Sequence, residues 1–127
     1  PFNSNGIARV LVQTALQTRL ENEEDPFGIR AVRRSKQELC AAVQALQLQY
    51  GAPLYVAETF ADTPILTLYC GSKAGIHLQR HLMRVGIMTV SCETYEGLDS
   101  SAVRLMLPDR QYMPLLLELT EQAVRLL

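Results

Sequence analysis

The sequence predicts an α+β domain in which helices pack against a small, largely antiparallel sheet. Short β-type runs come in neighbouring pairs, at residues 54–58 and 65–70 and again at residues 87–92 and 102–107. Strands that follow one another across polar or turn-rich loops favour antiparallel pairing. Helical periodicity precedes, separates and follows these pairs, which gives the order α-α-β-β-α-β-β-α without an internal repeat.

The first predicted helix spans residues 7–21 and carries apolar residues on two sides. The first stripe is Ile7, Val10, Leu11, Thr14, Ala15 and Thr18, and the second is Val12, Leu16 and Leu20. A helix that is apolar on two sides is normally buried on both. A chain of 127 residues offers little surface to cover both sides, so we expect part of this helix to lack a partner.

The second predicted helix begins after Asp25, with Pro26 at its first helical position, and ends at Tyr50, because Gly51 is a typical C-terminal cap. Its core stripe is expected to be Ile29, Val32, Leu39, Val43, Leu46 and Tyr50. Its other side carries Arg30, Arg33, Arg34, Lys36 and Gln37. A patch for an anion or RNA is one interpretation of this basic cluster. A solvated helix face is favoured, because neither interleaved aromatic residues nor a glycine-rich loop accompanies it.

Two further helices are predicted in the second half of the chain. Ser72 is expected to cap a short helix that runs to about Val85 and is ended by Gly86. The last helix follows Pro108, and Pro114 is compatible with it only within the first turn. The expected core face of this last helix is Tyr112, Leu116, Leu119, Ala123 and Leu126.

The composition excludes several classes of partner. Twelve basic residues nearly balance 13 acidic ones, so no overall charge favours nucleic acid or an anionic membrane. The longest uncharged run, from Ala41 up to Glu58, is too polar to span a bilayer. Cys40, Cys70 and Cys92 lie in apolar stretches, which is typical of reduced, buried thiols in a cytoplasmic protein. The chain starts at Pro1 without an initiator Met or a signal-peptide pattern, from which we expect a processed or excised segment.

Two motifs share features with ligand sites. His77 and His81 have a spacing that can clamp a metal ion. A polar helix face is favoured because no acidic residue shares their turn, so no metal site is predicted. Lys73 lies in a Gly-Ser-Lys-Ala-Gly segment. This segment can be interpreted as a phosphate-binding loop, or its lysine as a Schiff-base lysine. The segment lacks the spacing of a P-loop, which favours a strand-to-helix turn. No serine or cysteine has the surroundings of a nucleophile, and no catalytic residue is predicted.

Arg104 is the candidate binding residue. Strand alternation puts Val103, Leu105 and Leu107 on the core face and Arg104 on the opposite face. A planar guanidinium fixed on a strand is suited to hold a carboxylate by two parallel hydrogen bonds. The alternative is a solvated charge on a wet sheet face, and spacing alone favours that alternative.

Three segments of the second half, taken in order, form a wider pattern. They are Leu82-Met83-Arg84-Val85-Gly86-Ile87, Tyr95-Glu96-Gly97-Leu98-Asp99 and Val103-Arg104-Leu105-Met106-Leu107-Pro108. This order resembles the end of class I/II aminotransferases, and most of all the histidinol-phosphate aminotransferase and threonine-phosphate decarboxylase branch. There a helix ends in Leu-x-x-x-Gly-Ile, a strand and loop follow, and a strand bearing an Arg precedes the last helix. The start, Pro1-Phe2-Asn3-Ser4-Asn5, resembles the Pro-aromatic-Asn turn that follows the active-site lysine of these enzymes.

The resemblance covers essentially the whole chain in element order, through short and partly hydrophobic motifs. It implies transfer or elimination chemistry on an amino acid bound to pyridoxal phosphate, with Arg104 gripping the substrate carboxylate. Residues 1–25 then correspond to a turn and linking helix from the large domain, and residues 26–127 to the C-terminal small domain. The Schiff-base lysine and the other cofactor contacts belong before Pro1, because Lys73 comes too late in the order. The chain alone is therefore expected to be inactive and to bind no cofactor covalently.

The partners that the resemblance implies are the large domain of the same polypeptide, a second copy in a homodimer and an amino-acid substrate, with neither nucleic acid nor a membrane. Transamination, decarboxylation and lyase chemistry all remain open. A second hypothesis, from a different class, is a stand-alone binding or regulatory α+β domain that recognises a carboxylate through Arg104.

Overall fold

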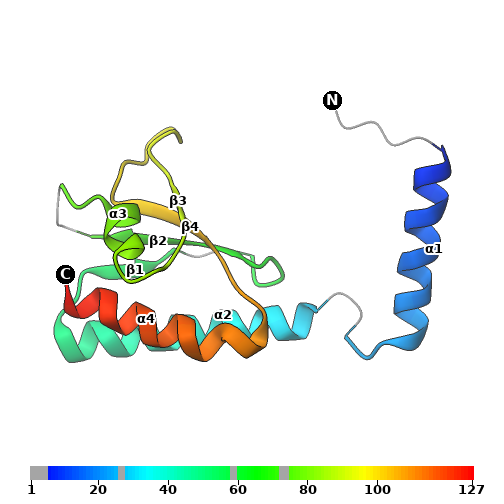
Figure 1. The fold of residues 1–127 in the computed structure, drawn as a ribbon, viewed down its shortest axis with the longest axis horizontal. Helices are drawn as coiled ribbons and strands as arrows, with labels where there is room; N and C mark the ends of the chain where they lie inside the picture. The colour runs from blue at the N-terminus through cyan, green and yellow to red at the C-terminus, as the bar shows by residue number, and fades with distance from the viewer. Residues whose placement is uncertain (1–5, 26–27, 58–59, 72–74) are drawn as a thin grey trace.

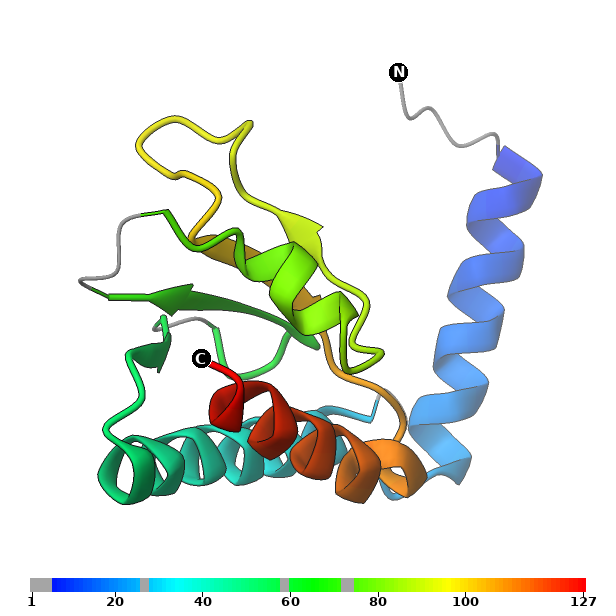
Figure 2. The same ribbon diagram turned by 60° about the vertical axis from the view of Figure 1, so that its left-hand side comes forward.

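The computed structural model describes residues 6–25, 28–57, 60–71 and 75–127. Helices cover one face of an antiparallel sheet in this part of the chain (Figures 1 and 2). The elements are α1 (Gly6–Asn22), α2 (Ile29–Tyr50), β1 (Leu54–Val56), β2 (Ile65–Cys70), α3 (Leu78–Met83), β3 (Val90–Ser91), β4 (Ala102–Met106), the 3-10 helix η1 (Arg110–Tyr112) and α4 (Met113–Arg125). The predicted fold class and order of helices and strands are confirmed.

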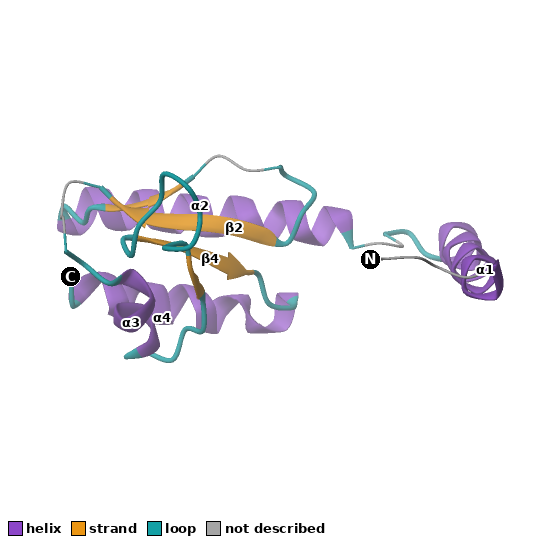
Figure 3. Cartoon of the chain, turned by 90° about the horizontal axis from the view of Figure 1, so that it is seen from above, coloured by secondary structure: helices purple, strands orange, loops and turns teal. Residues whose placement is uncertain are grey.

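The sheet has the strand order β1-β2-β4-β3, and each strand is antiparallel to its neighbours. Helices α2 and α4 lie side by side along one face of the sheet (Figures 1 and 3). The apolar residues that the sheet contributes to the core include Leu54, Leu66, Leu68, Val103 and Leu105. Thr67 and Arg104 are opposite each other in the register of β2 and β4. Opposed residues share a face of a sheet, so these two side chains lie together on the face away from the core.

Glycines end two helices as predicted. Gly51 follows α2 in the left-handed region, with φ 63°, and its N–H donates to the carbonyl of Gln47. Gly86 also has a positive φ, 92°, in the turn after α3. Because glycine has no Cβ, it adopts this conformation without the steric cost that other residues incur.

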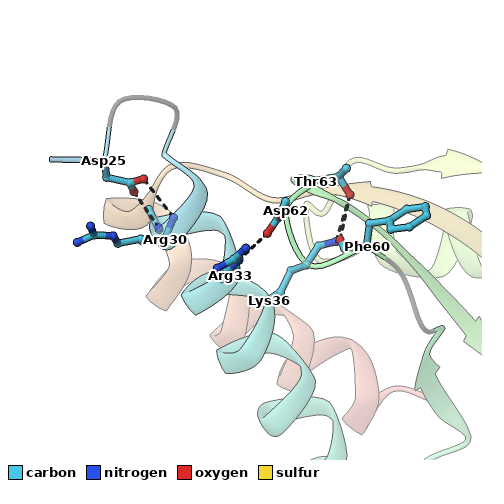
Figure 4. Close-up of polar contacts among 8 residues, drawn as sticks. Asp25, Arg30, Arg33, Lys36, Phe60, Asp62 and Thr63 are labelled. Carbon is cyan, nitrogen blue, oxygen red and sulfur yellow. Dashed lines mark hydrogen bonds and ion pairs between the residues drawn. The ribbon is translucent and has the colours of Figure 1, made fainter. Parts of the chain in front are cut away.

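The predicted start of α2 is wrong by a few residues. The helix begins at Ile29, because Gly28 precedes it in the left-handed region with φ 66° and interrupts the helical path. Asp25 still caps the helix from outside it, since its carboxylate accepts the backbone N–H groups of Arg30 and Ala31 at 3.2 Å each (Figure 4). Pro26 lies outside the described residues.

The short elements of the second half are shorter than predicted. β1 ends at Val56, and β3 contains only Val90 and Ser91. Within the described residues, β3 pairs only with β4, and the N–H of Ile87 bonds to the carbonyl of Leu82 in the turn after α3 instead of joining the sheet. α3 begins at Leu78, and its predicted cap, Ser72, lies outside the described residues.

The expected core face of α2 is correct in its middle, half-buried at Ile29 and Val32, and wrong at its C-terminal end. Leu39, Val43 and Leu46 are buried, whereas Tyr50 is exposed at the end of the helix. Lys36 was expected on the solvated face, but only 7% of it is exposed. Its long stem packs among apolar neighbours while the ammonium group finds oxygen partners.

The expected core face of α4 is also shifted. Tyr112 and Leu126 are exposed, because Tyr112 belongs to η1 and Leu126 follows the last helical residue. Pro114 lies in the first turn, as predicted. The buried residues of the helix are Met113, Leu116, Thr120, Ala123 and Val124. Thr120 is tolerated in the core because its hydroxyl donates to the carbonyl of Leu116 at 2.7 Å.

α1 stands apart from the sheet and the other helices (Figures 1 and 3). None of its residues is buried, and large apolar side chains on both predicted stripes are exposed. Among the described residues, no helix is both long enough and apolar enough to cross a membrane. The uncovered faces of α1 are therefore a surface that this chain does not bury by itself.

We expect the 127-residue chain to self-associate through α1. Uncovered apolar surface gains about 25 cal/mol for each Å2 that association removes from water. Sedimentation velocity should show a dimer or a larger species, and Leu16→Glu should shift it towards monomer. Gln13→Glu adds the same charge at an exposed polar position of α1 and should leave the association unchanged. A strictly monomeric chain whose α1 amides are strongly protected from hydrogen exchange would contradict this expectation.

Candidate functional site

Arg104 lies at the middle of β4, on the face of the sheet away from the core. Its neighbours Val103 and Leu105 are buried, whereas Arg104 is half-buried, so the predicted alternation is confirmed. Thr67 of β2 and Val90 of β3 flank it in the sheet register. Because strands pair with β4 on both sides, the backbone that carries Arg104 is held in place.

The guanidinium of Arg104 has one hydrogen-bond partner among the described residues. Its Nη1 donates to the hydroxyl oxygen of Tyr95 at 2.6 Å, and its Cζ lies 5.7 Å from the centre of the Tyr95 ring. A cation that bonds to the hydroxyl lies towards the rim of the ring, so the hydrogen bond is the principal contact. An arginine side chain has five N–H donors. Most of those of Arg104 therefore have no hydrogen-bond partner among the described residues.

Several arginines elsewhere in the described residues are paired with acidic side chains, but Arg104 is not. The pairs include Arg33 with Asp62, Arg110 with Glu38, and Arg125 with Glu121. Arg110 makes a two-point contact with Glu38, at 2.7 and 3.0 Å. Arg104 presents the same planar donor group without an acidic partner in the part of the chain that the structure describes. Such a group is suited to bind a carboxylate or phosphate by paired, charge-assisted hydrogen bonds.

Cys92 does not neutralise Arg104. Burial raises the pKa of the Cys92 thiol, and the positive charge of Arg104 lowers it by a smaller amount. The thiol is therefore protonated at neutral pH, and the guanidinium keeps its full charge. The Cys92 thiol therefore adds no negative charge beside Arg104.

Tyr95 reaches Arg104 from the loop between β3 and β4. The backbone of Tyr95 is bonded on both sides, from its N–H to Cys92 and from its carbonyl to Leu98. Gly97 follows with φ 79°, a conformation that favours glycine. The sequence motif included Tyr95 but assigned no role to it. The contact could have been predicted from a tyrosine that lies in a glycine-containing turn just before the strand that carries the arginine.

The two histidines do not form a metal site. The Nε2 of His81 lies 2.7 Å from the carbonyl oxygen of Ala123, so it carries the hydrogen and donates to α4. His77 is directed differently, with its Nε2 3.7 Å from a carboxylate oxygen of Glu93. Among the described residues, no group of histidine, cysteine and acidic side chains has the arrangement of a metal site. The expectation of a polar face is nevertheless wrong for His81, which is buried.

The basic cluster of α2 is used within the fold (Figure 4). Lys36 donates to the carbonyl of Phe60 and to the hydroxyl of Thr63, in the loop between β1 and β2. Burial lowers the pKa of its ammonium group. Arg33 pairs with Asp62 in the same loop. These contacts join the loop to the helix and explain the basic residues without an external anion.

Pyridoxal phosphate is held covalently by a lysine, and the lysine that the structure describes is Lys36. The chain has two lysines, and Lys36 is buried against the loop between β1 and β2. Lys73 lies outside the described residues. Among the described residues, no accessible lysine is present to hold pyridoxal phosphate covalently.

Comparison with solved structures identifies the fold. The histidinol-phosphate aminotransferase of Clostridium acetobutylicum matches with a TM-score of 0.58 and 17% identity, over 76% of this chain and 27% of that one. The L-threonine-O-3-phosphate decarboxylase of Porphyromonas gingivalis matches with a TM-score of 0.56 and 17% identity, over 76% and 28%. A decarboxylase of Sulfurospirillum multivorans matches with a TM-score of 0.63 and 13% identity, over 97% and 33%.

The chain has the fold of the C-terminal part of aminotransferase-like enzymes. This is the fold that the sequence motifs indicated. The chain spans a third or less of the length of the solved structures that it matches. No protein-family model and no curated protein sequence matches it.

Proposed function

We propose that this chain is the small domain of a pyridoxal-phosphate-dependent enzyme and that Arg104 binds the carboxylate of its amino-acid substrate. The observation that carries the proposal is the half-buried guanidinium of Arg104, which has no acidic partner among the described residues and lies on the open face of the sheet. The aminotransferase-like fold supports it, because a small domain of this kind belongs to a larger protein.

The role of the small domain is to bind and orient. Two parallel hydrogen bonds from a planar guanidinium fix both the position and the rotation of a carboxylate. A substrate held in this way presents its reacting carbon in one orientation, and such positioning contributes strongly to catalysis. The cofactor, which stabilises negative charge at that carbon, would be held by the large domain of the same polypeptide. In this proposal the enzyme is a cytoplasmic homodimer.

The proposal predicts where the cofactor attaches. In the full-length protein that carries this chain, borohydride reduction with pyridoxal phosphate should label one lysine outside residues 1–127, and individual amino acids should change the absorbance of the bound cofactor. The 127-residue chain by itself should gain no stoichiometric label. Stoichiometric labelling of Lys73, located by mass spectrometry, would contradict this arrangement. A full-length protein that binds carboxylates but no cofactor would instead support the stand-alone binding domain.

A further inference from the structure

The hydrogen bond between Tyr95 and Arg104 uses one nitrogen of the guanidinium and leaves the other two without a hydrogen-bond partner among the described residues. The bond uses Nη1, at 2.6 Å from the Tyr95 hydroxyl oxygen. In an arginine side chain the N–H of Nε and one N–H of Nη2 point along the same edge, on the side away from Nη1. No other hydrogen bond to Arg104 is made within the described residues, so this edge has no hydrogen-bond partner there.

We propose that Tyr95 is a positioning residue that holds Arg104 so that its Nε–Nη2 edge receives the substrate carboxylate. The inference rests on the proposed function and adds a second residue and a binding geometry to it. A carboxylate that binds along this edge makes two parallel hydrogen bonds while the contact with Tyr95 remains intact. The Nη1–Nη2 end is the less available alternative, since Nη1 already has a partner.

Arg104 needs a positioning residue because its neighbours in the sheet do not fix the orientation of its guanidinium. Thr67 and Val90, which flank it in the register, have short side chains and no hydrogen bond to the guanidinium. A long, flexible side chain loses conformational freedom when it binds a ligand, and this loss weakens binding. Elsewhere in the described residues, acidic partners hold arginines such as Arg110, but an acidic partner at Arg104 would compete with the substrate. A neutral tyrosine hydroxyl fixes the guanidinium without neutralising it.

Tyr95 is itself fixed well enough to serve this purpose. Its N–H bonds to the Cys92 carbonyl at 2.9 Å, and its carbonyl accepts the N–H of Leu98 at 3.1 Å. At the far end of the loop, the carboxylate of Asp99 accepts hydrogen bonds from the backbone N–H and the hydroxyl of Ser101. The hydroxyl bond is the main cause of the lowered pKa of Asp99. The loop backbone is therefore hydrogen-bonded both at Tyr95 and beyond it, which holds Tyr95 in position.

Kinetics of the full-length protein test the inference. Tyr95→Phe removes only the hydroxyl and should raise KM for the amino acid that the protein turns over by about three- to tenfold, the equivalent of one hydrogen bond, while kcat changes less than twofold. Tyr112→Phe, at an exposed tyrosine with no hydroxyl bond among the described residues, should change neither value. In an Arg104→Lys background, Tyr95→Phe should have no further effect, because the group that it positions is absent.

Chemical labelling gives a readout that is independent of activity. Phenylglyoxal reacts with accessible guanidinium groups, and Tyr95→Phe should accelerate the labelling of Arg104 several-fold while the exposed Arg80 serves as an unchanged internal reference. Equal labelling of Arg104 with and without the hydroxyl would overturn the inference. A large effect of Arg104→Lys on kcat/KM with none of Tyr95→Phe would overturn it too, but would leave the proposed function standing. No effect of Arg104→Lys would overturn the proposed function itself.

Discussion

Leu39→Ala should lower the free energy of unfolding by about 2–5 kcal/mol. Leu39 lies in the middle of α2 with 0% of its surface exposed, and it belongs to the core cluster that joins the helices to the sheet. Removing its buried methyl groups loses their transfer free energy and leaves a cavity that the surrounding helices and strands fill only in part. Urea denaturation followed by circular dichroism measures this change.

Leu48→Ala is the matched control for that experiment. Leu48 lies in the same helix and undergoes the same chemical change, but 90% of it is exposed. We expect its free energy of unfolding to change by less than about 0.5 kcal/mol. Equal losses in the two variants would mean that α2 does not pack on the sheet as described.

Much of the fold was predictable because it depends on local patterns. The alternation of residues 102–107 specified which side of β4 faces the core, and the burial of Val103 and Leu105 confirms it. Gly51 marked the end of α2 because the left-handed conformation of such a cap favours glycine, which has no Cβ. The paired strand runs predicted an antiparallel sheet, which is observed.

What the sequence did not predict depends on contacts between distant segments. Lys36 looks solvated beside three arginines, yet oxygens of the loop between β1 and β2 bind its ammonium group and allow its burial. His81 looks like a surface residue, yet the Ala123 carbonyl of α4 satisfies its ring in the core. A pattern of polar and apolar residues treats every charged or polar side chain as exposed. It therefore errs wherever a partner far along the chain provides the missing hydrogen bond.

The candidate site also has one feature that the sequence predicted and one that it did not. The position of Arg104 on the outer face followed from strand alternation, a local rule. Its lack of an acidic partner among the described residues did not follow from the sequence, because the strand register and the path of the loop from β3 to β4 decide which side chains reach it. That loop brings the Tyr95 hydroxyl, and no carboxylate of the described residues, within hydrogen-bonding distance. This difference supports the proposal that Arg104 is a binding residue, because a structural ion pair would place a carboxylate against it.

Arg104→Lys in the full-length protein should reduce kcat/KM for the amino-acid substrate by roughly one to two orders of magnitude. Lysine keeps the charge but replaces the planar pair of donors with a single ammonium group, so it cannot make the two parallel hydrogen bonds that we propose for the carboxylate. A hydrogen bond to a charged group contributes about 1.5–3 kcal/mol, and about 1.4 kcal/mol corresponds to a tenfold change in rate. Arg104→Ala removes the charge as well and should reduce kcat/KM further.

Thermal melts and cofactor absorbance of the same variants separate binding from folding. Both variants should melt close to the wild type, because the guanidinium lies outside the core and has Tyr95 as its hydrogen-bond partner within the described residues. Arg84→Lys is the control, since Arg84 is exposed and forms no ion pair within the described residues, and it should keep full activity. Unchanged kcat/KM in both Arg104 variants would make Arg104 a solvated strand charge. A large loss of stability with a proportionate loss of activity would instead make it a structural residue, and the carboxylate of the substrate would then need a different partner.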